Sequence, residues 1–172
     1  PRAAWRHGLH GVCMTRMRRH MQHVVTAASS SLVGTDDASV PSTSAPVSAA
    51  YIHLPFCKRK CFYCDFPVEA VGKNTQRTYV QDRMRDYVQL LCSEIAATQV
   101  LGSGPLQTVF FGGGTPSLVP PDLLAVILEA LDRRYGIAGD AEVSLEADPG
   151  TFDAARLRGY TALGVTRLSM GV

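Results

Sequence analysis

The 172-residue sequence has no long hydrophobic run, no paired set of cysteines and no large excess of charge of one sign. Its longest uninterrupted apolar stretch, Leu123–Leu128, has six residues, whereas a membrane-spanning helix needs about 20. The five cysteines are an odd number with no secretory pattern around them, which argues against a disulfide framework. The net charge is +2, and residues 51–172 carry 12 basic against 13 acidic side chains. These features exclude a membrane span, a disulfide scaffold and a nucleic-acid-binding surface.

Residues 1–49 differ in composition from the rest of the chain. They contain five Arg, no Lys and two acidic residues, and residues 26–50 include seven Ser and six Ala. This composition is typical of a mitochondrial or plastid transit peptide, and it has too few apolar residues to form a core. We therefore expect a disordered leader that directs the protein to a mitochondrial matrix or plastid stroma. The alternative is untranslated sequence upstream of a start at Met14, Met17 or Met21, which would leave the protein in the cytoplasm.

Residues 50–172 alternate between strand patterns and helical patterns. This alternation is typical of a parallel α/β fold, and it allows either a doubly wound sheet or an α/β barrel. Because the chain stops at Val172 inside a strand-like run, we expect these residues to be the N-terminal part of a domain truncated at its C-terminal end. The predicted strands are 50–56, 107–111, 142–147 and 165–170. The first predicted helix is 74–97, with a capping box formed by Thr78 and Gln81, and the second is 120–134, closed by Gly136. A third predicted helix is capped by Thr151 and ends at Gly164.

Three cysteines follow the first predicted strand at a C-x3-C-x2-C spacing: Cys57, Cys61 and Cys64. Three thiolates on one loop can each bind one iron of a [4Fe–4S] cluster, which leaves one iron open for a small molecule. A structural zinc site needs four ligands, and no second Cys or His pair follows, although His53 could in principle complete a tetrahedral site. The spacing therefore favours a cluster and leaves zinc open as the alternative.

Two further motifs end the next two predicted strands. Gly112–Gly114 allows the backbone to approach a ligand closely, although a tight strand-to-loop turn would also explain it. Glu146 places a carboxylate at the end of an apolar strand, as a ligand contact or as a rim salt bridge. Because functional groups of α/β barrels gather at the carboxyl ends of the strands, we expect the cysteine loop, the glycine run and Glu146 to lie at one edge.

These motifs resemble those of the radical S-adenosylmethionine (SAM) superfamily. Within it, the chain is similar to the oxygen-independent coproporphyrinogen III oxidases and the related HemW-type haem chaperones. The resemblance covers about residues 50–172 and implies a partial (β/α)6 TIM-like barrel, of which roughly the first half is present. It rests on four motifs in the family's order: Tyr51–Cys64 (YIHLPFCKRKCFYC), Gly112–Ser117 (GGGTPS), Glu146–Gly150 (EADPG) and Leu163–Val172 (LGVTRLSMGV).

The resemblance also implies a set of site residues. Cys57, Cys61 and Cys64 would hold the [4Fe–4S] cluster, and SAM would bind the open iron. A low-potential electron donor of the ferredoxin or flavodoxin type would then allow the cleavage of SAM. No role is assigned to His53 or Arg167. The implied SAM contacts are Tyr51, Tyr63, Gly113, Gly114, Thr115 and Glu146.

Phe66 bears on the choice between the two related activities. The coproporphyrinogen III oxidases, which decarboxylate propionates in porphyrin biosynthesis, usually have a further cysteine at the position of Phe66. The absence of this cysteine favours the haem chaperones, which bind haem and deliver it to acceptor proteins. The partners implied are thus haem or a porphyrinogen, an electron donor and haem acceptor proteins. Whether the protein is an enzyme stays open, and a structural metal-binding domain is the alternative of another class.

Overall fold

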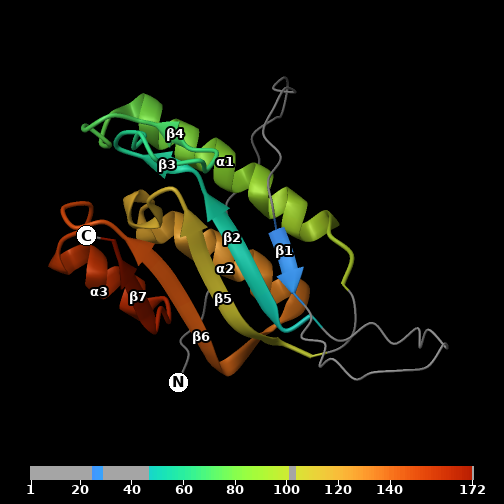
Figure 1. Cartoon of the computed structure of the whole chain (residues 1–172). Coiled ribbons are helices and arrows are strands. Elements are labelled where there is room, and N and C mark those ends of the chain that lie inside the picture. The colour runs from blue at the N-terminus through green and yellow to red at the C-terminus, as the bar shows by residue number, and fades with distance from the viewer. Residues whose placement is uncertain (1–24, 29–46, 101–103, 172) are drawn as a thin grey trace, which may run out of the picture.

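The computed structural model describes residues 25–28, 47–100 and 104–171. They form a five-stranded sheet in the order β1-β2-β5-β6-β7, three α-helices and a separate two-stranded sheet, β3-β4 (Figure 1). The elements are β1 (Val25–Ala28), β2 (Ala49–Leu54), β3 (Phe56–Cys57), β4 (Glu69–Ala70), α1 (Thr78–Ala97), β5 (Leu106–Gly113), the 3-10 helix η1 (Pro116–Leu118), α2 (Pro121–Tyr135), β6 (Ile137–Ala147), α3 (Ala154–Ala162) and β7 (Arg167–Met170).

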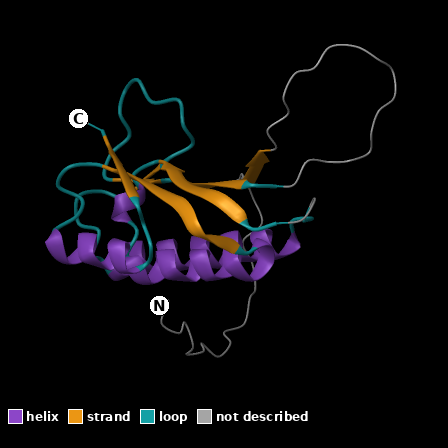
Figure 2. Cartoon of the chain, turned by 90° about the horizontal axis from the view of Figure 1, so that it is seen from below, coloured by secondary structure: helices purple, strands orange, loops and turns teal. Residues whose placement is uncertain are grey.

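The arrangement of the helices distinguishes between the two folds that the sequence allows. Strands β2, β5, β6 and β7 are parallel to one another, and a helix connects each to the next. The helices lie on one face of the sheet, where α1 contacts α2 and α2 contacts α3 (Figure 2). A doubly wound sheet carries helices on both faces, whereas a barrel carries them all outside. The structure therefore confirms the α/β class and the partial barrel.

The core lies between this sheet and the helices. Alternate residues of β2 (Ala50, Ile52 and Leu54) are buried against the helices, as the period of a strand requires. No helix within the described residues is long and apolar enough to cross a membrane. All six residues that the helical period predicts for the inner face of α1 are buried: Val80, Met84, Tyr87, Val88, Leu91 and Ile95.

The predicted caps of two helices are wrong. Helix α1 begins at Thr78, and Gln81 does not complete a capping box because its amide donates to the Thr75 carbonyl oxygen at 2.6 Å. Helix α3 is capped by Asp153, whose carboxylate accepts from the Arg156 N–H at 2.8 Å. Thr151 instead lies buried in the preceding turn. The predicted end of α2 is confirmed, since Gly136 caps it with a positive φ of 74°.

Strand β1 is an element that the sequence did not predict. It pairs antiparallel with β2, from Val25 opposite Ile52 to Ala28 opposite Ala49, on the edge of β2 that β5 leaves free. Its residues belong to the segment 1–49 that the sequence assigns to a leader. The remainder of that segment up to residue 46 lies outside the described residues.

Candidate functional site

The predicted site residues follow three adjacent strands at one edge of the sheet. The cysteine loop comes after β2 and includes β3, Gly113 ends β5, and Glu146 is the penultimate residue of β6. Because β2, β5 and β6 are parallel neighbours, their carboxyl ends lie side by side (Figure 1). Tyr51 of β2 pairs in register with Phe110 of β5, and their rings stack with centroids 5.9 Å apart. This stack lines the sheet face opposite the helices.

The three cysteines of the loop are free thiols, and each is partly exposed. Cys57 lies in β3, and the backbone N–H of Cys64 donates to the carbonyl of Cys61 at 3.1 Å, which folds the second half of the loop into a turn. Burial raises the pKa of the Cys57 thiol; the Thr115 hydroxyl, which donates to its sulfur at 3.5 Å, opposes this rise. Cys64, Cys61 and Asp148 raise the same pKa further, so these groups lie within electrostatic reach of Cys57.

A zinc ion and a [4Fe–4S] cluster require their thiol ligands to converge to different degrees. A single tetrahedral zinc, with Zn–S bonds of about 2.3 Å, brings its sulfurs to about 3.8 Å from each other. Among the residues that the structure describes, no three His, Cys, Asp or Glu side chains converge enough to hold one metal ion. A [4Fe–4S] cube binds each thiolate through a different iron and so spreads its ligands. Three free thiols on one partly exposed loop fit that donor set.

Gly113 and Gly114 lie where the chain approaches β2 and the loop that follows it. Gly113 has a positive φ of 108°, and a Cβ atom there would overlap the ring of His53. A Cβ at Gly114 would lie 2.7 Å from the carbonyl carbon of Pro55. The Gly114 N–H donates to the Leu54 carbonyl at 2.9 Å, and Thr115 continues this ladder to Phe56 at 2.8 Å. The glycines are therefore needed for the contact between the two segments, whatever else approaches them.

Glu146 reaches back to the glycine run. Its carboxylate accepts a hydrogen bond from the backbone N–H of Gly113 at 3.2 Å. Burial raises the pKa of the Tyr51 hydroxyl, and the negative charge of Glu146 raises it further. No ion pair involving Glu146 occurs within the described ranges, so the predicted alternative of a rim salt bridge is not observed. The structure thus brings together Tyr51, Gly113 and Glu146, three of the predicted SAM contacts, from three strands.

Tyr63 occupies a different position from these three residues. Its side chain is largely exposed, and its ring meets that of Phe62 edge to face with centroids 5.1 Å apart. A hydrogen bond between its hydroxyl and Cys61 raises the pKa of Tyr63. Tyr63 therefore contacts the cysteine loop itself and no other predicted SAM contact.

His53 is a residue of the site whose role the sequence left open. Its Nε2 lies 3.1 Å from the carbonyl oxygen of Pro67, so this nitrogen carries the proton and donates. The Tyr51 hydroxyl lies 3.5 Å from the other ring nitrogen, Nδ1. Because the ring also packs on Gly113, His53 joins the end of the cysteine loop to the glycine run. Both ring nitrogens and the ring face are engaged in these contacts, so His53 does not point toward the thiols as the fourth ligand of a zinc site. Its place two residues after Tyr51, on the same face of the strand, is the signal that could have identified it.

A buried polar network fixes the loops behind the site. The Ser117 hydroxyl accepts from the Asp148 N–H at 3.2 Å and pairs with the Thr151 hydroxyl at 2.5 Å. The Tyr160 hydroxyl lies 3.0 Å from the Ser117 carbonyl oxygen. On the exposed side, the Lys58 ammonium donates to the Gly150 carbonyl at 2.7 Å. The loops after β2, β5 and β6 are therefore connected to one another by side chains.

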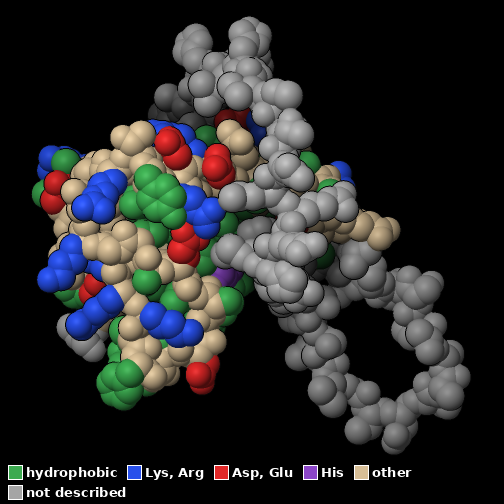
Figure 3. All heavy atoms as spheres, turned by 90° about the horizontal axis from the view of Figure 1, so that it is seen from above, with side chains coloured by type: hydrophobic (Ala, Val, Ile, Leu, Met, Phe, Trp, Pro, Cys, Tyr) green, Lys and Arg blue, Asp and Glu red, His purple; other side chains and the backbone are tan. Residues whose placement is uncertain are grey.

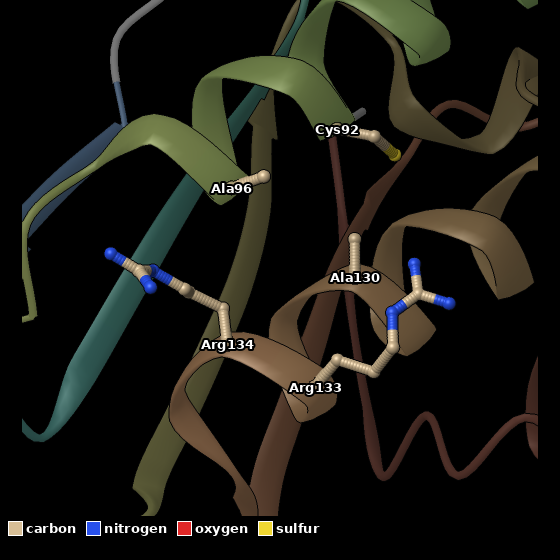
Figure 4. A pocket seen from close by; sticks show the side chains of 5 residues that line it. All are labelled: Cys92, Ala96, Ala130, Arg133 and Arg134. Carbon is tan, nitrogen blue, oxygen red and sulfur yellow. The ribbon is translucent and has the colours of Figure 1, made fainter.

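Two other features lie apart from this site. Arg167 forms a surface ion pair with Glu142 at 3.2 Å, with both side chains well exposed. A pocket of about 190 Å³ lies between α1 and α2, lined by Cys92, Ala96, Ala130, Arg133 and Arg134, whose two guanidinium groups leave α2 in different directions (Figure 4). One of them binds the Thr98 carbonyl and the other binds Glu129. Because this pocket lies toward the carboxyl ends of the helices, it is at the opposite end of the fold from the cysteine loop.

Comparisons with known proteins agree with this geometry. The family described as the radical SAM superfamily matches residues 51–172. The protein "Heme chaperone HemW" of Synechocystis sp. is 54% identical over 125 residues, which cover 73% of this chain and 30% of that protein. "Radical S-adenosyl methionine domain-containing protein 1, mitochondrial" of Bos taurus is 36% identical over 143 residues, which cover 80% of this chain and 30% of that protein. This chain thus spans less than a third of the length of these relatives.

A solved structure is also similar. Coproporphyrinogen III oxidase (HemN) from Escherichia coli, described as a radical SAM enzyme, aligns with a TM-score of 0.61 and 29% identity, over 73% of this chain and 27% of that one. The residues that the superfamily matches include the cysteine loop, the glycine run and Glu146. The chain belongs to the radical SAM superfamily and, within it, to the HemN/HemW-like family.

Proposed function

We propose that the complete protein is a radical SAM haem chaperone, which binds haem and hands it to acceptor proteins. The observation that carries this proposal is the 54% identity to a protein named as a haem chaperone. The presence of Phe66, where the related oxidases usually have a further cysteine, supports the same choice. Phe66 is 55% exposed and packs near His53, with ring centroids 6.3 Å apart. It therefore occupies the loop as an aromatic contact and offers no additional thiolate.

A radical SAM domain implies a [4Fe–4S] cluster and SAM in general. We infer that Cys57, Cys61 and Cys64 hold the cluster and that Thr115 donates its hydroxyl to the Cys57 sulfur. A hydrogen bond to a thiolate stabilises its charged form, so Thr115 would favour ligation. The cluster held by these thiolates would supply the reductive, one-electron cleavage of SAM, with the electron coming from a low-potential donor protein.

The neighbouring strands would hold SAM itself. The partly buried carboxylate of Glu146 is an acceptor for an ammonium or hydroxyl group of the ligand, and its present partner, the Gly113 N–H, is a backbone donor. Tyr51 supplies an aromatic ring beside them. Gly114 and Thr115 continue the backbone along the same rim. Tyr63, which is largely exposed on the cysteine loop, would cover the ligand from the side of the cluster.

A second function has a specific observation in its favour. The structural match to coproporphyrinogen III oxidase supports an enzyme that removes propionate carboxyl groups from a porphyrinogen. Both functions need the cluster and SAM, so the site described above does not separate them. Haem or a porphyrinogen, a low-potential electron donor and haem acceptor proteins are the proposed partners.

One sample of the complete protein, reconstituted anaerobically with iron and sulfide, can separate the two functions. We expect a stoichiometric haem complex in a spectroscopic titration, transfer of that haem to an apo-acceptor protein, and no release of carbon dioxide from coproporphyrinogen III. Formation of the decarboxylated product would overturn the chaperone assignment. The absence of iron from protein reconstituted in this way would support the third alternative, a structural domain without a cluster.

We also propose that residues 1–49 act as a leader to a mitochondrion or plastid. The Arg-rich composition supports this, and the relatives from Bos taurus, Mus musculus and Danio rerio carry the word mitochondrial in their names. Without a working leader the protein would stay in the cytoplasm. Fusing residues 1–49 to a fluorescent protein tests the leader, because the fusion should enter an organelle and a version with its five Arg replaced by Gln should not. A cytoplasmic distribution of the first fusion would reject the leader.

A further inference from the structure

The tip of the cysteine loop exposes aromatic side chains that contact little of the described chain. Phe62 has a relative exposure of 101%, and its described ring contact is with Tyr63, which is itself 73% exposed. Leaving a phenylalanine in water forgoes the stabilisation of about 1.5–3 kcal/mol that its burial would bring. Large apolar side chains that stand out at a functional loop commonly mark a contact surface.

The same tip is positively charged. Between Cys57 and Pro67 the loop carries Lys58, Arg59 and Lys60 against one acidic residue, Asp65. Lys58 is bound to the Gly150 carbonyl. Arg59 and Lys60 are exposed, and neither forms an ion pair with any residue that the structure describes. In the view onto this end of the molecule, exposed hydrophobic side chains are bordered by Lys and Arg side chains and by several acidic ones (Figure 3).

We propose that Arg59, Lys60 and Phe62, here called the loop tip, form the docking surface for an acidic electron-transfer protein that reduces the cluster. This rests on the proposed cluster at Cys57, Cys61 and Cys64. The three tip residues lie within two residues of Cys61 in sequence, so a partner bound there would bring its redox centre near a ligand of the cluster. In each encounter the partner would lose one electron and the cluster would gain it.

Charge complementarity selects this kind of partner. Complexes between electron-transfer proteins are small and transient, and their encounter is steered by opposite charges. Two cations without an ion-pair partner, next to one exposed aromatic side chain, suit the small contact of an electron-transfer protein. A nucleic acid would need a longer basic surface. Tyr63 is not included in the loop tip, because its hydroxyl forms a hydrogen bond with Cys61 and Tyr63 is a proposed SAM contact.

The test uses the complete, reconstituted protein with a recombinant flavodoxin as the acidic probe. The dissociation constant of the complex is measured as a function of ionic strength, and the rate of cluster reduction is followed by stopped flow. We expect Arg59→Glu/Lys60→Glu to raise the dissociation constant about tenfold at low ionic strength, with a smaller effect at high salt. Phe62→Ala should raise it several-fold at every ionic strength. Reduction by photoreduced deazaflavin, a small molecule that needs no docking surface, should be unchanged in Phe62→Ala.

The controls match the variants in charge and in exposure. Arg85→Glu/Arg133→Glu reverses two exposed cations on α1 and α2, and Tyr79→Ala removes an aromatic side chain of α1 that is 67% exposed. Both should bind flavodoxin as the unaltered protein does. Should the double reversal at the loop tip prevent incorporation of iron, Phe62→Ala decides the matter alone, because it leaves the charge unchanged.

Three results would overturn the proposal. The first is a dissociation constant that does not differ between the tip variants and the controls. The second is equal slowing of flavodoxin and deazaflavin, which would mean that Phe62 acts on the cluster itself. The third is a lower melting temperature of Phe62→Ala with unchanged flavodoxin binding, which would place Phe62 against the rest of the complete chain. Haem binding, measured on the same samples, reports separately on the proposed chaperone function.

Discussion

The carboxylate of Glu146 accepts a hydrogen bond from the backbone N–H of Gly113 at 3.2 Å, across 33 residues of sequence. This contact joins the carboxyl ends of β5 and β6 with a charged acceptor and a backbone donor, the two kinds of group that an amino-acid ligand needs. Since Glu146 forms no ion pair within the described residues, its charge is not committed to another side chain. An incoming ammonium or hydroxyl group would find this acceptor in place.

Glu146→Gln should weaken SAM binding without affecting the cluster. The amide keeps the size of the side chain and an acceptor for Gly113, but it loses the charge that strengthens a hydrogen bond to a cationic ligand. We expect the dissociation constant of SAM, measured by calorimetry on the reconstituted protein, to rise about tenfold or more. Glu142→Gln is the matched control, because Glu142 lies on the same strand and pairs with Arg167 at the surface. Equal SAM affinity in both variants would remove Glu146 from the ligand site.

Gly113→Ala should destabilise the protein more than an alanine at an equally unusual but open position. A Cβ at Gly113 would overlap the His53 ring, in addition to the strain of a φ of 108°. Gly164 has a φ of 88°, and a Cβ atom there would meet nothing within 4 Å, so Gly164→Ala reports the backbone strain alone. We expect losses of about 1 kcal/mol for Gly164→Ala and about 2–4 kcal/mol for Gly113→Ala, measured by urea unfolding of the apoprotein. Similar losses would show that the His53 ring moves aside freely.

Much of the fold could be predicted because it depends on local periodicity. The inner face of α1 follows from a 3.6-residue period, and β2 follows from alternation. The period of each helix cannot say on which side of the sheet the helix lies, which is why the sequence allowed both a doubly wound sheet and a barrel. The predicted cap of α3 was wrong because Thr151 and Asp153 both suit a cap. The Thr151 hydroxyl instead binds the Asp148 carbonyl and the Ser117 hydroxyl, and Asp153 caps the helix.

The candidate site was predictable in its residue types but not in its contacts. The order of the motifs placed the cysteines, the glycines and Glu146 at consecutive strand ends. The sequence leaves two interpretations of the glycine run open, an approach for a ligand and a tight strand-to-loop turn. The structure shows that Gly114 packs closely against the backbone of Pro55, a contact that neither interpretation specifies. The contact between His53 and Pro67 spans 14 residues across the cysteine loop, a distance over which neither periodicity nor turn patterns carry information.

His53→Phe should loosen the end of the cysteine loop. The phenyl ring keeps the packing on Gly113 but removes the N–H that donates to the Pro67 carbonyl at 3.1 Å. The pairing of β3 with β4, in which the Val71 N–H donates to Cys57, should then open more often. Hydrogen exchange of that N–H should accelerate about fivefold, as expected for the loss of one hydrogen bond of about 1 kcal/mol. His53→Gln, which retains an N–H donor, should restore part of the protection, and identical exchange in both variants would show that this hydrogen bond does not hold the loop.

Tyr160→Phe should make the stability of the protein less sensitive to alkaline pH. Tyr160 is almost fully buried, and its hydroxyl lies 3.0 Å from the Ser117 carbonyl and 2.9 Å from the Val119 carbonyl. Burial raises its pKa from 10.0 to about 12, which favours the neutral form in the folded state. The folded state therefore keeps a proton that the unfolded state loses first, so stability is highest below pH 10 and falls as the pH rises from about 10 toward 12.

The variant separates this effect from the loss of the hydrogen bond. At pH 7 the free energy of unfolding should fall by about 1–2 kcal/mol, because two buried carbonyl groups lose a donor. Between about pH 10 and about pH 12 the unaltered protein should lose up to about 3 kcal/mol through this residue, a loss that the variant does not undergo. The slope is reduced and not abolished, because burial also raises the pKa values of Tyr51 and Tyr87. Tyr79→Phe, at an exposed position of α1, should follow the unaltered protein throughout. A difference between Tyr160→Phe and the unaltered protein that stays constant from pH 8 to about pH 12 would show that the Tyr160 hydroxyl ionises equally in the folded and unfolded states.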